Sequence, residues 1–183
     1  MKKVETAIEG LIIIEPTVLT DERGFFFESY HQAKFSELGI PDNFVQDNHA
    51  KSVKGTLRGL HYQIARPQAK LCRVIYGAVL DVAVDIRRGS PSFGKFVSTI
   101  LSAENMQQIY IPEGFAHGYL VLSETAEFLY KCSNFYVSEY ERGVLWNDPE
   151  IGINWNVESP TLSAKDKKHL PLSQIALHDL PVY

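Results

Sequence analysis

Cysteine is scarce in this chain. Only Cys72 and Cys132 occur among the 183 residues, and they do not form a Cys-x-x-Cys pair. The spacing therefore gives no support to a zinc or redox motif. Both cysteines lie in apolar, strand-like runs, so we expect inert buried thiols.

The chain also lacks a long apolar run and an excess of positive charge. The N-terminal apolar run, Leu11 to Ile14, is far shorter than the ~20 residues that a membrane-spanning helix requires, and no signal-peptide pattern follows it. The formal net charge is −4, which argues against nonspecific binding to nucleic acid. We therefore expect a cytoplasmic protein with neither a membrane nor a nucleic-acid partner. A small anionic ligand held by a few local cations remains possible.

The remaining composition is that of an ordinary folded domain. Hydrophobic residues make up 45% of the chain and charged residues 22%, so a sizeable core can form. We find no repeat, low-complexity tract or linker. The length and this uniformity predict a single domain over residues 1–183.

Short strand signals recur along the chain, punctuated by Gly and Pro. The clearest is the period-two alternation that ends at Ile86. We predict strands over 11–15, 25–30, 44–49, 56–64, 71–76, 79–86, 96–101, 108–111, 116–122 and 127–132. Helical character is confined to 31–38 and to a short tail helix that opens with Ser163-Ala164-Lys165-Asp166, a pattern like a capping box. Many strands with little helix indicate a mainly β sandwich or barrel, whose interior is wide enough for one small ligand.

The segment around His61 carries the strongest chemical signal. On a regular strand, Arg58 shares one face with Leu60, whereas His61 and Gln63 point together to the other. A lone histidine on a strand is more often a hydrogen-bonded core residue. However, a buried Arg58 would need an anion nearby, and two polar groups on one face indicate a pocket or a solvated face.

A metal site must be weighed because His61 and His117 lie on predicted neighbouring strands. Pro112 to His117 reads Pro-x-Gly-x-x-His, which resembles a motif of the cupin barrel. Metal-binding cupins usually carry His-x-His, but here the second position is Gln63, a poor metal ligand. The following segment holds cations such as Lys70 and no acid. The sequence therefore predicts no metal site.

Each of the other polar residues, taken alone, fits an ordinary structural role. Arg23, Arg58 and Lys70 fit surface charges, and Tyr130 fits an ordinary half-buried strand. Tyr136 fits a packing aromatic, Glu141 a solvated loop residue, and Asp166 a helix-capping acid. Composition and spacing alone reach no further than a soluble β protein that binds a ligand.

Taken together, the motifs closely resemble those of the dTDP-4-dehydrorhamnose 3,5-epimerases, enzymes of nucleotide-sugar metabolism. The resemblance covers nearly the whole chain, from Ile12 to Tyr183. Its most specific segments are 21–28, 44–48, 57–63, 80–85, 111–118, 145–149 and 162–166. It implies a mainly β, cupin-type jelly-roll β-barrel with a few short helices, no metal or organic cofactor, and a homodimer acting on a dTDP-sugar in dTDP-L-rhamnose biosynthesis.

The resemblance also implies roles for individual residues. His61 is expected to remove the proton next to the C4 ketone, and Asp166 to orient its imidazole. Tyr130 is expected to return a proton on the opposite face, and Lys70 to stabilise the enolate oxygen. The residues expected to bind sugar and nucleotide are Arg23, Glu28, Gln46, Asn48, Arg58, His117, Tyr136, Glu141 and Lys165, with Tyr136 stacking on the base.

Several functions share these motifs. The closest alternative is an epimerase that acts at one carbon only, or on a related deoxy- or amino-sugar, because such enzymes share the His, Asp and Tyr. A ketoisomerase, a non-catalytic cupin that binds a sugar and a metal-dependent cupin oxygenase are weaker alternatives.

The aromatic run Phe25-Phe26-Phe27 cannot point as a whole into one barrel. We therefore expect this segment to pack on a partner subunit, where Arg23 and Glu28 could reach the other site.

Overall fold

The computed structural model describes residues 1–41 and 43–183, and most of its regular structure is strand. In chain order the strands are β1 Lys2–Glu5, β2 Ile12–Glu15, β3 Leu19–Asp21, β4 Gly24–Phe26, β5 Gln46–Val53, β6 Leu57–Gln63, β7 Lys70–Tyr76, β8 Ala78–Asp85, β9 Phe96–Ser102, β10 Gln108–Ile111, β11 Phe115–Val121, β12 Thr125–Cys132 and β13 Glu141–Gly143. The helical segments are α1 Gln32–Glu37 and four single turns, η1 Ser138–Tyr140, η2 Asp166–Lys168, η3 Leu172–Gln174 and η4 Leu177–Asp179.

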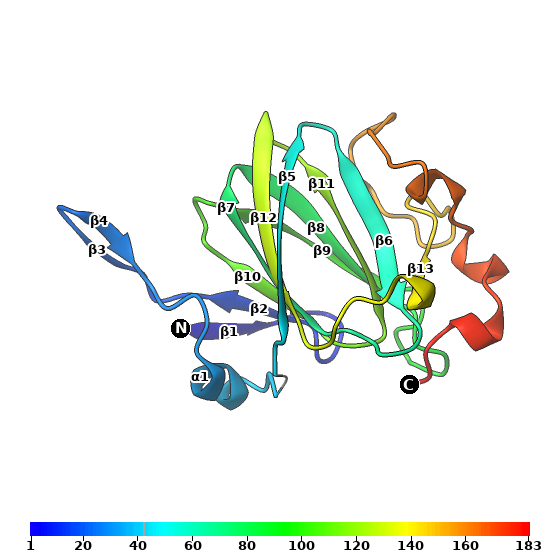
Figure 1. Ribbon diagram of the computed structural model, residues 1–183, viewed down its shortest axis with the longest axis horizontal. Coiled ribbons are helices and arrows are strands. Elements are labelled where there is room, and N and C mark those ends of the chain that lie inside the picture. Colours follow the sequence, from blue (N-terminus) through cyan, green and yellow to red (C-terminus); the bar gives the residue numbers. More distant parts are fainter. Residues whose placement is uncertain (42) are drawn as a thin grey trace.

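Two antiparallel sheets face each other in a cupin-type jelly roll (Figure 1). The larger sheet has the order β1-β2-β10-β7-β12-β5, and the smaller one β13-β6-β11-β8-β9. This confirms the predicted mainly β fold. Within the described part of the chain, no helix is long and apolar enough to cross a membrane.

Among the described residues, apolar side chains form three buried clusters, two of which position the site. Phe128, Ile109 and Leu101 belong to the cluster between the sheets. A second cluster, which includes Leu60 and Trp155, joins the smaller sheet to the C-terminal segment. That segment runs along the β6 and β13 side of the molecule (Figure 1). Burial of each large apolar side chain contributes about 1.5–3 kcal/mol, so this contact anchors the segment that supplies part of the site.

The sequence prediction fails in three places. Residues 25–30 do not form one strand, because only Gly24–Phe26 pairs, with Leu19–Asp21. Strands β1, β3 and β13 were not predicted. The tail helix is a single turn, η2. The short strand β1 carries little apolar periodicity of its own, and the partner of β13 is β6, about 80 positions earlier in the sequence.

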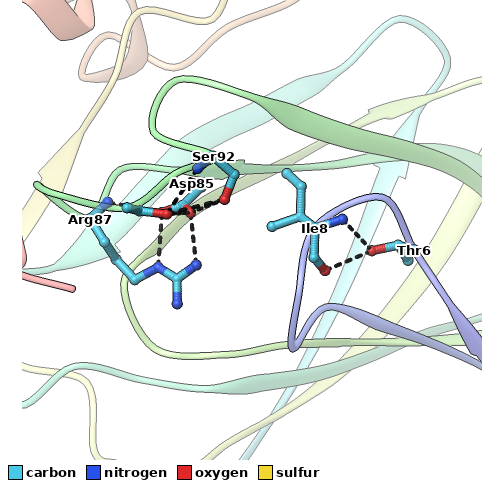
Figure 2. A network of polar contacts seen from close by, with 6 residues as sticks. Thr6, Ile8, Asp85, Arg87 and Ser92 are labelled. Carbon is cyan, nitrogen blue, oxygen red and sulfur yellow. Dashed lines mark hydrogen bonds and ion pairs between the residues drawn. The ribbon is translucent and has the colours of Figure 1, made fainter.

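Asp85 ends β8 and organises the turn that follows (Figure 2). Its carboxylate accepts hydrogen bonds from Arg87 Nε at 2.9 Å and from the Ser90 and Ser92 hydroxyls, each at 2.6 Å. Burial opposes ionisation, but these donors outweigh it and lower the pKa of Asp85 to about 2. The Arg87 guanidinium also lies over the Tyr183 ring, which ties this turn to the end of the chain.

Figure 2 also shows the turn between β1 and β2. The Thr6 hydroxyl donates to the Ile8 carbonyl at 3.0 Å, and the Ile8 backbone N–H donates back to the hydroxyl oxygen at 3.2 Å. This local pair closes the turn, as short hydroxyl side chains commonly do.

The hairpin of β3 and β4 projects away from the body of the molecule (Figure 1). Its Phe25 and Phe26 are 62% and 65% exposed. Phe27 instead packs under Arg73 of β7, whose guanidinium lies 5.6 Å from the ring centroid. The Phe25 and Phe27 rings stack on each other, with centroids 6.1 Å apart. The three aromatics do not all point into the barrel, as expected from the sequence.

Candidate active site

His61 and Asp166 form a hydrogen-bonded pair at the edge of a cavity. His61 Nε2 lies 2.6 Å from Asp166 Oδ1. The His61 side chain is 29% exposed, whereas that of Asp166 is only 4% exposed. Burial opposes ionisation of Asp166, but contacts from His169, His61 and Ser163 lower the pKa of its carboxyl well below the usual range. An ionised carboxylate only accepts hydrogen bonds, so Nε2 carries the proton and Nδ1 is the basic nitrogen.

The capping pattern at the start of the tail explains how Asp166 is held. The Ser163 hydroxyl oxygen accepts a hydrogen bond from the Asp166 backbone N–H at 3.0 Å. In a complete capping box the acid would bond back to the serine N–H. Here the carboxylate turns to His61 instead. One half of the motif closes the turn, and the other half is free for the site.

A bulge in β6 changes the direction of Arg58. His61 pairs with His117 of β11, and Arg58 pairs with Tyr119, so four residues of β6, from 58 to 61, oppose three of β11. Arg58 and His61 consequently line the same cavity. The prediction that they point to opposite faces is wrong, because the extra residue breaks the period of two. Arg58 is exposed rather than buried, and its Nε donates to Ser52 Oγ at 3.1 Å.

Gly59 permits this bulge. Its φ of +133° lies in a region that L side chains rarely adopt. A Cβ at this position would lie 2.5 Å from the Gly118 Cα and 2.9 Å from the His117 carbonyl oxygen. The two strands approach so closely that only glycine fits.

The cavity has a volume of about 480 Å³ and lies between the sheets and the C-terminal segment. His61 enters it from β6, Lys70 from β7, His117 from β11 and Tyr130 from β12. His61 and Tyr130 therefore project from opposite sheets into one space. Burial raises the pKa of Tyr130 above its usual value, so its hydroxyl keeps the proton at neutral pH and can act as a donor.

His117 forms a second, fully buried pair with Asp81 of β8. Its Nε2 lies 2.9 Å from Asp81 Oδ2. Burial lowers the pKa of His117 despite the nearby carboxylate, which acts in the opposite direction. The structure thus places one partly accessible imidazole and one buried imidazole on adjacent strands.

A second cavity of about 310 Å³ shares His61, Lys70, Tyr130 and Lys165 with the first. Hydrogen bonds order its wall. Gln46 Oε1 accepts from the Tyr136 backbone N–H at 2.9 Å, and Gln46 Nε2 donates to Asn48 Oδ1 at 3.1 Å. The Tyr136 hydroxyl donates to Glu141 Oε2 at 2.5 Å, and Glu141 also pairs with Lys165. Tyr136 is 50% exposed, so one face of its ring is available for stacking.

The structure brings together eleven of the thirteen predicted site residues. These are His61, Lys70, Tyr130, Asp166, Gln46, Asn48, Arg58, His117, Tyr136, Glu141 and Lys165. Arg23 and Glu28 are not among them. Arg23 pairs with Asp21 in the projecting hairpin, and Glu28 pairs with Lys34 of α1.

Sequence reasoning missed three supporting residues, Asp81, Ser52 and His169. Asp81 alternates with apolar residues along β8, both faces of which are buried. An acid on such a strand needs a partner, and that need was the available signal. Ser52 and His169 carried no comparable signal, because their partners emerge only from the fold.

Among the residues that the structure describes, two groups of side chains could supply metal ligands. In each of His61, Asp166, His169 and Cys72, Asp81, His117 the possible ligand atoms lie within 4.8 Å of one another. Neither group is well suited to bind a metal ion. Asp166 Oδ1 already binds the proton of His61, and Lys70 and Lys165 line the same cavity. Burial raises the pKa of the Cys72 thiol well above its usual value, which opposes formation of a thiolate ligand. Both cysteines are free and buried, as predicted.

Comparisons with known proteins agree with this geometry. Residues 5–174 match the family profile of dTDP-4-dehydrorhamnose 3,5-epimerase. The enzyme of that name from Pseudomonas aeruginosa is 56% identical over 170 residues, which cover 92% of this chain and 94% of the relative. The chain belongs to the dTDP-4-dehydrorhamnose 3,5-epimerase family.

The solved structures of this family have the same fold. The dTDP-6-deoxy-D-glucose-3,5-epimerase RmlC of Legionella pneumophila, in complex with dTDP-4-keto-L-rhamnose, superposes with a TM-score of 0.97. It is 50% identical and the match covers 100% of this chain and 98% of that one. A more distant relative, the dTDP-4-dehydrorhamnose 3-epimerase of Streptomyces niveus, is 38% identical over 169 residues, with 91% of this chain and 82% of the relative covered. The chain is therefore also similar in sequence to an epimerase that is named for one carbon only.

Proposed function

We propose that this chain is an isomerase that inverts C3 and C5 of dTDP-4-dehydro-6-deoxy-D-glucose and forms dTDP-4-dehydro-L-rhamnose. The observation that carries the proposal is the His61–Asp166 pair facing Tyr130 across one cavity. Inversion needs a base on one face of the sugar ring and an acid on the other. The two sheets supply these groups separately. The similarity to 3,5-epimerases over nearly the full chain supports the same reaction.

The chemistry follows from the C4 ketone. His61 Nδ1 takes the proton from the carbon next to the ketone, and the C–H electron pair moves into an enolate on O4. The Lys70 ammonium lines the cavity and stabilises the charge that develops on this oxygen. Tyr130 donates its hydroxyl proton to the opposite face of the same carbon and becomes a phenolate, which solvent reprotonates. His61 returns its proton to solvent before the next cycle.

One site serves both carbons because C3 and C5 both flank C4. The sugar must change its position between the two steps so that each C–H bond in turn faces Nδ1. Histidine suits this task, since an imidazole can both accept and donate a proton in a reaction. Asp166 stabilises the imidazolium that forms in each step.

The remaining residues of the two cavities bind the rest of the substrate. Arg58 lines the first cavity, and its guanidinium binds the anionic diphosphate, for which arginine is well suited. Tyr136 stacks on the base of the nucleotide. Sugar and nucleotide hydroxyls and carbonyls bind to Gln46, Asn48, His117, Glu141 and Lys165.

Arg23 and Glu28 belong to the proposal only through a second subunit. Both lie outside the two cavities, near the projecting hairpin, whose aromatic residues are exposed. We infer a homodimer in which the hairpin of one subunit completes the site of the other. A cytoplasmic location and activity without a metal or cofactor are further parts of this proposal.

Mixed dimers test the exchange of the hairpin. Arg23→Ala and His61→Ala subunits are each expected to be nearly inactive alone. When the two are unfolded together and refolded at equal ratio, half of the dimers are mixed, and each has one site with both side chains intact. About a quarter of the wild-type activity is then expected, by the arithmetic of a two-fold dimer. If the hairpin acts within its own subunit, the mixture stays inactive.

Incubation with dTDP-4-dehydro-6-deoxy-D-glucose in deuterated water tests the reaction. Deuterium at both C3 and C5 with formation of the L-rhamno product supports the proposal. Label at only one carbon would assign the chain to the single-carbon epimerases. No label with tight substrate binding would leave a binding module.

A further inference from the structure

His169 lies against the His61–Asp166 pair, outside the lining of either cavity. Its Nε2 is 3.5 Å from Asp166 Oδ1, the oxygen that binds His61. Its ring meets the His61 ring edge to face, with centroids 5.7 Å apart and an interplanar angle of 77°. The side chain is only 11% exposed. His169 thus contacts both members of the pair without access to the substrate.

His169 Nε2 lacks a good hydrogen-bond partner among the described residues. Nε2 is buried and makes no well-formed hydrogen bond to any residue that the structure describes. Burial of a polar nitrogen without a good hydrogen bond costs about 1–3 kcal/mol. The Asp166 carboxylate is the acceptor that faces this nitrogen, at 3.5 Å. A small movement of either group would form the hydrogen bond.

Gly143 makes room for this arrangement. Gly143 of β13 pairs with His61 of β6, so it sits beside the catalytic strand. A Cβ on Gly143 would overlap with Nε2, Cε1 and Cδ2 of His169. Gly143 does not adopt a left-handed backbone angle. The space for the His169 ring, rather than the backbone conformation, therefore requires glycine here.

We propose that His169 is a positioning residue: its imidazole holds the Asp166 carboxylate in the orientation that His61 requires. The proposal rests on the assignment of His61 as the base. As His61 becomes an imidazolium, Asp166 must keep Oδ1 on Nε2, and a second N–H donor on the same oxygen limits rotation of the carboxylate. A misplacement of about 1 Å in such a group can cost on the order of a hundredfold in rate.

Two replacements of His169 separate this role from simple packing. His169→Phe keeps a ring against Gly143 and His61 but removes both nitrogens. His169→Gln loses the ring and keeps an amide N–H that can reach Asp166. We expect His169→Phe to lower kcat about tenfold with KM unchanged, because the residue does not touch the substrate, and His169→Gln to recover most of that loss. If His169 only fills space, Phe retains kcat and Gln loses it.

Gly143→Ala provides an independent test. The new methyl group displaces the His169 ring, so we expect a fall in kcat similar to that of His169→Phe. In a His169→Ala background the ring is gone and the methyl group has space, so Gly143→Ala then has little further effect. Such non-additivity shows that the two residues act through one contact. Multiplicative losses would mean that the methyl group disturbs His61 directly and would count against the proposal.

The same assay on His61→Ala distinguishes the inference from the assignment on which it rests. Loss of C3 and C5 exchange in His61→Ala, with near-normal kcat in both His169→Phe and His169→Ala, overturns the role of His169 alone. Retained exchange in His61→Ala overturns the assignment of the base. Melting temperatures of all variants identify any that fail to fold. If His169→Phe does not fold, the kcat values of His169→Gln and Gly143→Ala still test the role of His169.

Discussion

His61 Nε2 and Asp166 Oδ1 lie 2.6 Å apart although 105 positions separate the two residues in sequence. His61 belongs to β6, and Asp166 to the C-terminal segment that packs on the same sheet through Trp155 and Leu172. The orientation of the His61 imidazole therefore depends on the docking of that segment. Any change that loosens the segment should affect catalysis before it unfolds the sheets.

Asp166→Asn should lower kcat by roughly 10²–10⁴-fold while the fold is kept. An asparagine can donate to Nε2, which favours protonation of Nδ1 and removes the basic nitrogen from the substrate side. Steady-state kinetics and the melting temperature measure the two effects. Asp179→Asn is a suitable control, because Asp179 pairs with Arg142 away from the cavities. A fall in melting temperature with unchanged kcat would show that Asp166 is only structural.

Tyr130→Phe should slow net inversion more than proton exchange. The ring remains and keeps its packing against Phe128, at a centroid distance of 5.9 Å, but the donor hydroxyl is lost. His61 can still remove protons and return solvent deuterium to the same face. NMR compares deuterium incorporation with product formation. Equal slowing of both, or slowing of neither, would transfer the role of acid to a water molecule or another side chain.

Gly59→Ala should destabilise the protein by about 2–4 kcal/mol, because it combines an unfavourable φ with a clash against β11. Gly89→Ala is a matched control, since Gly89 has a φ of +85° with open space around the Cβ position. It should cost only about 1 kcal/mol, from the backbone angle alone. Urea unfolding of both variants measures the difference. Equal losses would mean that the close approach of β6 and β11 relaxes easily.

Asp85 should make stability depend on acidity. Its pKa in the folded protein, about 2, is below the value of about 3.9 in an unfolded chain. A lowered pKa stabilises the folded state above the unfolded value, and this contribution disappears as the pH falls towards 2. It amounts to about 2–3 kcal/mol at neutral pH. Urea unfolding of Asp85→Asn should show a deficit of this order at pH 7 that narrows between about pH 5 and pH 2. A deficit that does not depend on pH would contradict this account.

The sequence predicts most strands because their apolar residues alternate, as in β8. It cannot predict the face of Arg58, since the bulge next to it depends on pairing with β11, whose residues lie about 60 positions away. For the same reason the edge strand β13 escaped prediction, because its partner β6 lies about 80 positions earlier in the sequence. Strand β1 pairs with the neighbouring β2, but its four residues show no apolar alternation that would predict a strand.

The residues of the candidate site were likewise predicted only in part. Resemblance to a family nominated His61, Tyr130 and Asp166, and the structure brings them to one cavity. No pattern in the chain predicts that His169 turns its ring towards the pair. His169 is three positions after Asp166, a spacing that brings side chains together in a helical turn, but the turn itself was predicted only in outline.

Deuterium exchange by His61→Ala tests the central claim, that one histidine removes the protons of both carbons. The variant and the wild-type protein are incubated with dTDP-4-dehydro-6-deoxy-D-glucose in deuterated water, and label at C3 and C5 is followed separately by NMR. The account predicts that exchange at both carbons is lost while the variant still binds dTDP. Exchange at either carbon at the wild-type rate would show that another group acts as the base.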